Sequence, residues 1–285
     1  MVEYNPKSWL NLIFHSYSRY VFRRLLPVLL YQTLYTATLA YLFHYFEVEF
    51  ISTTSVHSIL GIVLGFFLVF RTNGAYDRWW EGRKVWGELV NNTRNLALKF
   101  SAMLPGDHPQ RMYIAETIAA YPLALKEHLR QGVPQEVSDE MFDKLSLSRL
   151  KHVPNAIAQK LFALTNQYKK EGVIDAEQYR VLDGELSMLT DITGKCERIR
   201  NTPIPYSYSM FMKKFIFTYI VTLPFAFITT YHYWTILIVV LILYILMSIE
   251  LLAEEIEDPF GSDINDLPTD SLADKIGQNI KEIMG

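Results

Sequence analysis

The sequence has a single cysteine, Cys196, among its 285 residues. One cysteine cannot form a disulfide within a chain, nor hold a thiolate metal cluster by itself. Common enzyme motifs are also missing, since we find no glycine-rich phosphate loop, no paired-histidine zinc motif and no nucleophile elbow. The seven histidines are scattered along the chain. The sequence therefore indicates a protein that is not an enzyme.

A strong charge of either sign is absent as well. The chain carries 27 Lys and Arg against 30 Asp and Glu, which gives a formal net charge of -3. Surfaces that bind nucleic acid are usually basic, so we expect no nucleic acid partner. Half of the residues are hydrophobic, and 18 Tyr, 17 Phe and 5 Trp make the chain rich in aromatic side chains. This composition indicates a protein partly in a membrane and partly in water.

Two uncharged segments near the start of the chain are long enough to cross a membrane. Leu25 to Phe43 contains no Asp, Glu, Lys or Arg, and about 20 apolar residues in a helix span the hydrocarbon core. We expect Pro27 in the first turn of this helix, where its missing amide donor costs little. The second segment, Phe50 to Phe70, is polar at its start and apolar at its end. This gradient is typical of a pore-lining helix, and a lipid-facing helix with a polar start is the alternative.

A third uncharged stretch, Phe215 to Ser248, has 34 residues, which is too many for one span and enough for two short ones. An aromatic cluster from Tyr231 to Trp234 stands midway and favours a membrane interface. We therefore predict a helical hairpin broken between Thr229 and Trp234, and four membrane helices in all.

Basic residues predict how these helices are oriented, because lysine and arginine collect on the cytoplasmic side. They flank the start of the first helix, the end of the second and the start of the third, while the two opposite connections have none. The flanking residues are Arg19, Arg23, Arg24, Arg71, Arg78, Arg83, Lys84, Arg198, Arg200, Lys213 and Lys214. We expect a multi-pass protein of the cell (plasma) membrane with both termini in the cytoplasm.

The region between the second and third membrane helices has the pattern of amphipathic helices. The predicted helices are Val85 to Met103, Met112 to Arg130, Ile157 to Tyr168 and Ala176 to Arg200. After Ser248 the helical register continues through acidic residues until Pro259-Phe260-Gly261 stops it. The predicted parts are an N-terminal segment with two membrane helices (1–71), a cytosolic helical region (72–210), two further membrane helices (211–249) and an acidic cytosolic C-terminal segment (250–285).

One stripe of the second helix is apolar, because Ile62, Phe66 and Phe70 lie four residues apart. If several copies of the chain presented this stripe to a shared axis, rings of apolar side chains would form a constriction that water wets poorly. The alternative is that the three side chains pack against other helices, which spacing alone favours.

Four short motifs occur in the order and spacing of one channel family. They are Phe70-Arg71, Arg78-Trp79-Trp80-Glu81, Ile204-Pro205-Tyr206 with Tyr208, and Asp258-Pro259-Phe260-Gly261 ahead of Asp263 and Asp266. With the four-helix hydropathy profile, they make nearly the whole chain resemble the bestrophin family. The fragment Cys196-Glu197-Arg198-Ile199 is most similar to the bacterial branch.

The resemblance implies an all-α membrane protein that forms a homopentamer, with four membrane helices per subunit continuous with a cytosolic helical body. The family has three apolar neck residues at four-residue spacing before its Arg-Trp-Trp motif. Counted back from Arg78, these fall on Ile62, Phe66 and Phe70. The family also has a narrower cytosolic aperture, for which the register leaves either Arg180 or Val181; arginine rings would favour anions, and valine rings would restrict size.

The resemblance also raises calcium as an optional ligand, although no cofactor is required. Eukaryotic members bind calcium in an acidic turn after Pro-Phe-Gly, where Asp263 and Asp266 match two carboxylates and Asp258 stands in place of an asparagine. Ile264 and Asn265 interrupt the acidic run, whereas calcium prefers six to eight oxygen ligands. A solvated acidic turn is the alternative.

We therefore expect a channel that conducts monovalent ions passively, with further copies of itself and membrane lipids as partners. The resemblance implies chloride. Bacterial relatives can prefer cations, and the acidic stretch from Glu250 to Asp270 makes a sodium or potassium channel the alternative. A secondary transporter should have inverted repeats, and no internal symmetry is visible. A membrane anchor for an interaction domain would leave the polar start of the second helix unexplained.

Overall fold

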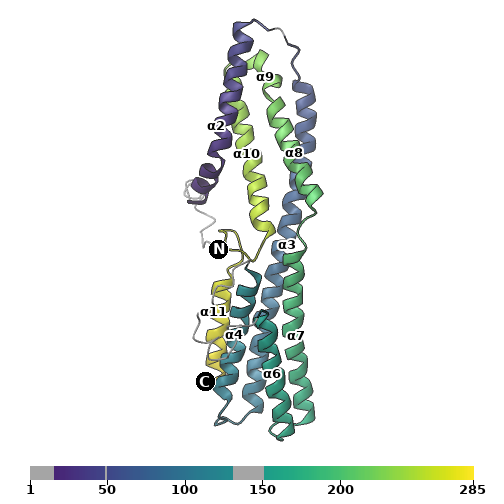
Figure 1. The fold of residues 1–285 in the computed structure, drawn as a ribbon, viewed down its shortest axis with the longest axis vertical. Helices are drawn as coiled ribbons and strands as arrows, with labels where there is room; N and C mark the ends of the chain where they lie inside the picture. Colours follow the sequence, from purple (N-terminus) through teal and green to yellow (C-terminus); the bar gives the residue numbers. More distant parts are fainter. Residues whose placement is uncertain (1–15, 49, 131–150) are drawn as a thin grey trace. The chain divides into compact units, whose positions relative to one another are not determined.

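The computed structural model describes residues 16–48, 50–130 and 151–285. In these ranges the chain is helical and contains no strand (Figure 1). Residues 1–15 of the predicted N-terminal segment and residues 131–150 of the predicted cytosolic region lie outside the description. The helices are α2 (Ser16–Tyr45), α3 (Thr54–Met103), α4 (Arg111–Leu129), α6 (Val153–Lys170), α7 (Ala176–Asn201), α8 (Tyr206–Thr222), α9 (Pro224–Tyr231), α10 (Trp234–Glu257) and α11 (Thr269–Met284).

The contacts between these helices divide the described residues into two compact units. Among the described residues, the membrane unit contains 16–48, 50–78 and 203–257, and the helical body contains 79–130, 151–202 and 258–285. Helix α3 is a single helix of 50 residues that contributes its first half to one unit and its second half to the other. The prediction that membrane helices continue into a helical body is thus confirmed.

Four helical segments of the described chain are long and apolar enough to cross a membrane. They are Arg19–Tyr45, Thr54–Met103, Ala176–Tyr231 and Trp234–Glu257, of which the third owes its apolar part to α8 and α9. The chain turns between α9 and α10, where His232 has a positive φ of 48°. The predicted hairpin with a break between Thr229 and Trp234 is therefore confirmed.

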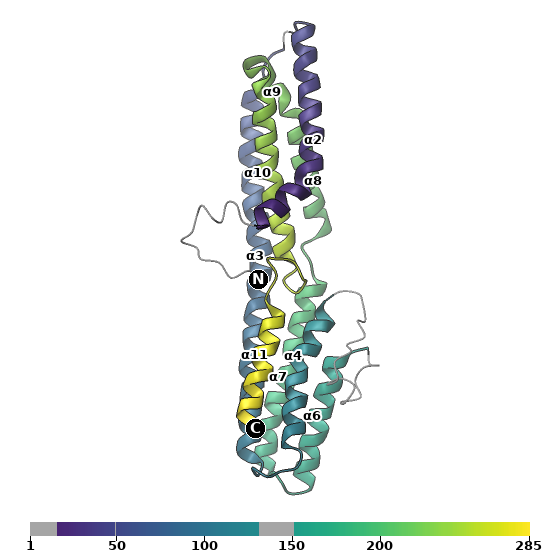
Figure 2. The ribbon, with the colours of Figure 1, turned by 90° about the vertical axis from the view of Figure 1, so that its left-hand side faces the viewer.

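The prediction that Pro27 lies in the first turn of a helix is wrong. Helix α2 begins at Ser16, so Pro27 is inside it. Proline has no amide hydrogen, and the carbonyl of Arg23 therefore lacks its usual partner in the helix. Figure 2 shows a bend near the N-terminal end of α2, which is how a helix accommodates an internal proline.

No break separates the second membrane helix from the predicted helix Val85 to Met103, because α3 runs through both. Two glycines inside α3 allow close packing instead of ending the helix. A Cβ at Gly74 would lie 3.7 Å from Ile204, and one at Gly82 would lie only 3.2 Å from Phe260 and Leu267. Close packing at these two positions thus outweighs the tendency of glycine to weaken a helix.

In the C-terminal segment, the sequence predicted the end of α10 but not the helix α11. Helix α10 ends at Glu257, directly before Asp258-Pro259-Phe260-Gly261, as predicted. Helix α11 was not predicted, yet it is amphipathic and buries Ala273, Ile276, Ile280 and Met284. The segment from Asp258 onward thus belongs to the helical body.

The helical body has a continuous apolar core formed by α3, α4, α6, α7 and α11. Trp86, Phe100 and Tyr121 are fully buried there. Local signals define its helices well: α7 begins with a capping box, in which the Asp175 side chain accepts from the Gln178 amide and the Gln178 side chain accepts from the Asp175 amide.

Charged residues attach the start of α11 to α4. Arg130 and Lys126 both contact the Asp270 carboxylate, the lysine at 2.9 Å. The hydrogen bond from Arg130, opposed by partial burial and supported by Lys126, holds the pKa of Asp270 at about 2. Asp270 is therefore ionised at any physiological pH and keeps both contacts.

Replacing Tyr121 by Phe should destabilise the helical body. The Tyr121 hydroxyl donates to the Leu189 carbonyl at 2.7 Å and lies 2.6 Å from the Thr193 hydroxyl, all inside the core. Loss of these buried hydrogen bonds should cost about 1–3 kcal/mol, seen as a lower melting temperature in detergent. Tyr31→Phe, at a side chain that is 76% exposed, is the control and should melt like the parent. Equal melting of both variants would contradict the packing described for α4 and α7.

Candidate functional site

The three predicted neck residues lie on the outer surface of α3. Ile62, Phe66 and Phe70 are 63%, 64% and 65% exposed. The opposite side of the same helix is buried within the membrane unit at Leu64, Leu68, Arg71 and Ala75. Within the described chain, the stripe therefore does not pack in a core, and it is free to face lipid or other copies of the chain.

The stripe changes from polar to apolar and back along α3. Ser55 lies on it before Ile62, and Asn73 and Asp77 continue it after Phe70; all three are exposed. A face that is apolar only over its middle turns differs from a uniformly lipid-facing helix. This pattern suits an aqueous path with one dry section.

Polar side chains fix the start of α3 against α8 and α9. The hydroxyls of Ser52 and Thr54 donate to the Ala226 carbonyl at 2.8 and 2.5 Å. The His57 ring is buried, with its Nε2 atom 3.0 Å from the Thr222 hydroxyl. At this end of the membrane unit, α3 is thus held by directed hydrogen bonds.

Directly after the stripe, a buried ion cluster fixes α3 against α10. Arg71 is 1% exposed, and its Nη2 atom lies 2.6 Å from Oε2 of Glu257. Its Nε atom lies 3.5 Å from Oε1 of Glu250, which is also buried. One guanidinium group thus lies beside two carboxyl groups of α10.

Glu257 extends this cluster to the chain segment before α8. Its Oε1 atom accepts the Ile204 amide at 2.9 Å, and its backbone carbonyl accepts from Arg78 Nε at 3.0 Å. The last residue of α10 therefore joins three of the four motifs that the sequence analysis singled out: the arginine after the stripe, the Arg-Trp-Trp motif and the Ile-Pro motif.

Inside the helical body, the Arg-Trp-Trp and Pro-Phe-Gly motifs meet each other. The Trp79 indole donates to the Asn265 carbonyl at 2.9 Å. Phe260 is 1% exposed and packs on Gly82, where no side chain intervenes. The sequence did not predict these pairings, which join residues more than 170 positions apart.

The two aperture candidates lie on the outer face of α7. The Arg180 side chain is 80% exposed and pairs with Glu177 at 3.4 Å, and Val181 is 44% exposed. Leu182 and Leu186 on the opposite face are buried in the core. Both candidates are therefore free of the core, and the choice between them stays open.

The acidic turn after α10 is closed by its own carboxylate. Asp266 is buried, and its Oδ2 atom accepts the Asp263 amide at 2.6 Å, whereas Asp258 and Asp263 are exposed. In the described part of the chain, these three residues do not form a group whose carboxylate oxygens converge. The turn is not preformed for six to eight calcium ligands. Calcium binding here stays a prediction.

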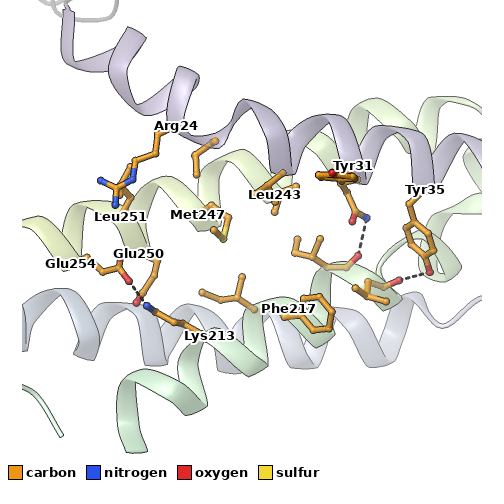
Figure 3. Close-up of a pocket in the computed structure, with 16 residues that line it drawn as sticks. Arg24, Tyr31, Tyr35, Lys213, Phe217, Leu243, Met247, Glu250, Leu251 and Glu254 are labelled. Carbon is orange, nitrogen blue, oxygen red and sulfur yellow. Dashed lines mark hydrogen bonds and ion pairs between the residues drawn. The ribbon is translucent and has the colours of Figure 1, made fainter. Parts of the chain in front are cut away.

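A cavity of about 720 Å³ opens between α2, α8 and α10 of the membrane unit (Figure 3). Its walls are mainly apolar, with Leu243, Met247 and Phe217 among them. One end is charged, because Lys213 pairs with Glu254 at 2.5 Å beside Glu250. The cavity is thus apolar along most of its length and charged at one end.

One cluster of ligand-type side chains was missed by the sequence analysis. His128 at the end of α4, His152 before α6 and Glu197 on α7 lie together in the helical body. The residues are far apart in sequence, so no spacing motif could have revealed them.

A model of a known protein family matches almost the whole chain. A family model described as "Bacterial/Fungal Bestrophin protein" matches residues 1–282. Two relatives carry the name "voltage-dependent anion channel-forming protein". The one from Nostoc sp. is 38% identical over 235 residues, covering 79% of this chain and 76% of the relative. The one from Mesorhizobium japonicum is 31% identical over 265 residues, covering 92% of this chain and 85% of the relative.

Solved structures are similar over the same length. A crystal structure of a bacterial bestrophin homologue from Klebsiella pneumoniae, carrying a point mutation, superposes with a TM-score of 0.82 at 28% identity. The match covers 92% of this chain and 99% of that one. The helical architecture and the order of the helices are therefore shared.

Replacing Arg71 by Met should destabilise the membrane unit strongly. The change leaves the buried Glu250 carboxylate and the partly buried Glu257 carboxylate without their cation, and breaking a buried ion pair typically costs about 3–5 kcal/mol. The expected result is a lower melting temperature in detergent than for Lys84→Met, which removes an exposed charge from the same helix.

Adding Glu250→Gln and Glu257→Gln to Arg71→Met should recover part of the loss, because no unpaired charge then remains buried. If Arg71→Met alone melted like Lys84→Met, the ion cluster would have no role in stability.

Proposed function

The chain belongs to the bacterial and fungal bestrophin family, and from this premise we propose that it is a homopentameric channel for monovalent anions. The family and four apolar helices make it a membrane protein. Relatives named as anion channel-forming proteins support an anion, with chloride as the expected ion. The basic flanks support a plasma membrane location with both termini in the cytoplasm.

The exposed apolar stripe of α3 is the observation that carries this proposal. A single chain encloses no pore with it, since Ile62, Phe66 and Phe70 point away from the chain's own core. Several copies that turn this stripe to a common axis would bury it and form three stacked rings. Successive rings would be about 6 Å apart, given four residues at 1.5 Å rise.

The proposed neck works as a hydrophobic gate. A narrow apolar section of a pore loses its water easily. An ion that enters it must give up its hydration shell, so the dry section is a barrier to conduction. Aromatic rings can also touch permeating ions, with edges that attract anions and faces that attract cations. The neck would therefore limit conduction and leave part of the ion preference to ring orientation.

The second proposed constriction lies on α7. Arg180 in a ring of copies would attract anions, and its pairing with Glu177 is exposed and therefore weak. Val181 in the same place would restrict ions by size only. An anion-selective pore is better served by Arg180.

A cation channel of the same fold is the second candidate function. Asp77 favours it, because this exposed carboxylate lies on the stripe that continues from Phe70. Rings of aspartate are typical of cation-selective pores. Asp77 and Arg180 thus predict opposite ion preferences.

Shrinking the neck should raise conductance. In the triple variant Ile62→Ala/Phe66→Ala/Phe70→Ala, smaller side chains would widen and wet the constriction, and single-channel current in planar bilayers should increase several-fold. The matched control Val56→Ala/Leu60→Ala changes exposed apolar residues elsewhere on α3 and should conduct like the parent. Unchanged unit current in the triple variant would remove the neck assignment.

Ion preference should appear in the reversal potential under a potassium chloride gradient, measured with and without calcium. An anion channel should reverse near the chloride potential, and Arg180→Ala should move this potential toward that of potassium. Reversal near the potassium potential in the parent would overturn anion selectivity in favour of the cation channel. Absence of unit currents would contradict a channel and favour a transporter.

The same recordings test calcium. A calcium effect that Asp263→Ala abolishes would support calcium binding at the acidic turn.

A further inference from the structure

Three side chains with metal-binding atoms converge in the helical body, and none of them is a proposed pore residue. His128 lies in the last turn of α4, His152 caps the start of α6, and Glu197 lies near the end of α7. The Nε2 atoms of His128 and His152 lie 2.6 and 2.9 Å from the same atom, Oε1 of Glu197. The centroids of the His128 and His152 rings are 4.3 Å apart.

The hydrogen bonds around His152 show which of its ring atoms faces the cluster. Its Nδ1 atom accepts the Asn155 amide at 3.2 Å, so in the neutral ring Nε2 carries the proton and donates to Glu197. His128 directs its Nε2 atom to the same oxygen. Two donors thus share one acceptor atom, and no described residue donates to Oε2 of Glu197.

The bonds that hold the cluster come from outside it. Arg200 donates to the backbone carbonyl of His128 at 2.7 Å, which fixes the end of α4 against α7. Cys196, the neighbour of Glu197, is fully buried and fixes that part of α7 in the core. The three ligand atoms therefore start from positions defined by the fold, which lowers the cost of binding an ion between them.

The geometry needs only a small change to admit a metal ion. Zinc bonds to histidine nitrogen and carboxylate oxygen are about 2.0–2.2 Å long, so tetrahedral ligand atoms lie roughly 3.3 Å apart. The present separations of 2.6 and 2.9 Å would increase by about 0.7 and 0.4 Å, respectively. All three side chains are between 21% and 34% exposed, which gives an ion access from water.

The donor set selects the class of ion. Two imidazoles and one carboxylate suit zinc and similar transition metals, while calcium and magnesium prefer oxygen ligands alone. Binding through Nε2 of His152 would move the ring proton to Nδ1, and the Asn155 amide would lose its acceptor. Only an ion with high affinity for imidazole offsets that loss.

We propose that His128, His152 and Glu197 form a binding site for a zinc-class divalent metal ion, with water completing its coordination. The ion would join the end of α4, the start of α6 and the last turns of α7. The alternative is a hydrogen-bonded trio that binds no metal.

The test is zinc binding by the purified full chain, without a histidine tag and stripped by a chelator, in competition with a chromophoric zinc indicator. The expected stoichiometry is one ion per chain, with a rise in melting temperature. Cobalt in place of zinc should give the visible absorption of a tetrahedral nitrogen and oxygen site.

Three variants remove ligands while keeping local structure. His152→Asn retains a capping side chain at the start of α6, His128→Gln retains a helix former, and Glu197→Gln retains size without charge. Each should weaken zinc affinity by more than about 100-fold, since loss of an outer partner alone costs 10- to 100-fold. His108→Asn, at a half-buried histidine outside the cluster, is the matched control and should bind as the parent.

Melting temperatures without zinc report whether each variant is folded, so a folding defect is separable from a lost ligand. Parent protein that binds no zinc at concentrations well above that of the chain would overturn the proposal. Unchanged zinc affinity in the folded His128→Gln and His152→Asn variants would overturn it as well. Neither result depends on ion conduction.

Discussion

The buried cation of Arg71 is the constraint on which the rest of the membrane unit depends. A guanidinium that is 1% exposed is tolerated only with carboxylates beside it, and Glu250 and Glu257 supply them from α10. Glu257 is the last residue of α10, and its carboxylate contacts both Arg71 and the Ile204 amide. These two contacts fix the end of α10 beside α3. The register of α3 is thereby fixed one residue after Phe70, and the outward direction of the apolar stripe follows from the inward direction of Arg71.

The sequence predicted what depends on local pattern. The four membrane segments were predictable from the length of their uncharged stretches, because about 20 apolar residues in a row are typical of a membrane helix. The stop before Pro259 and the ends of α4 and α7 were also predictable from breakers and periodicity. The start of α2 was not, because proline was assumed to mark a first turn. Helix α11 was missed although Ile276, Ile280 and Met284 have helical spacing, because residues 250–285 were predicted only as an acidic C-terminal segment.

Contacts between distant segments could not be predicted from one sequence. Nothing in the spacing of His128, His152 and Glu197 indicates that three helices bring them together. The sequence likewise does not predict that Trp79 pairs with Asn265 or that Gly82 packs on Phe260, although the resemblance had singled out the motifs that contain Trp79 and Phe260. For Ile62, Phe66 and Phe70, periodicity predicted a shared face, and the fold adds that this face is exposed in one chain. Whether Arg180 or Val181 lines an aperture depends on neighbouring copies.

The way α11 closes the helical body sets an order of events during synthesis. The carbonyls of Ile283 and Met284 accept from Ser101 and Arg111, and Arg94 donates to Asn279, so the second half of α3 acquires its contacts with α11 only when residues 269–284 have left the ribosome. All four membrane segments precede that point in the chain. Insertion into the bilayer can therefore begin before the helical body finishes folding, and in that interval the apolar face that α11 covers stays exposed.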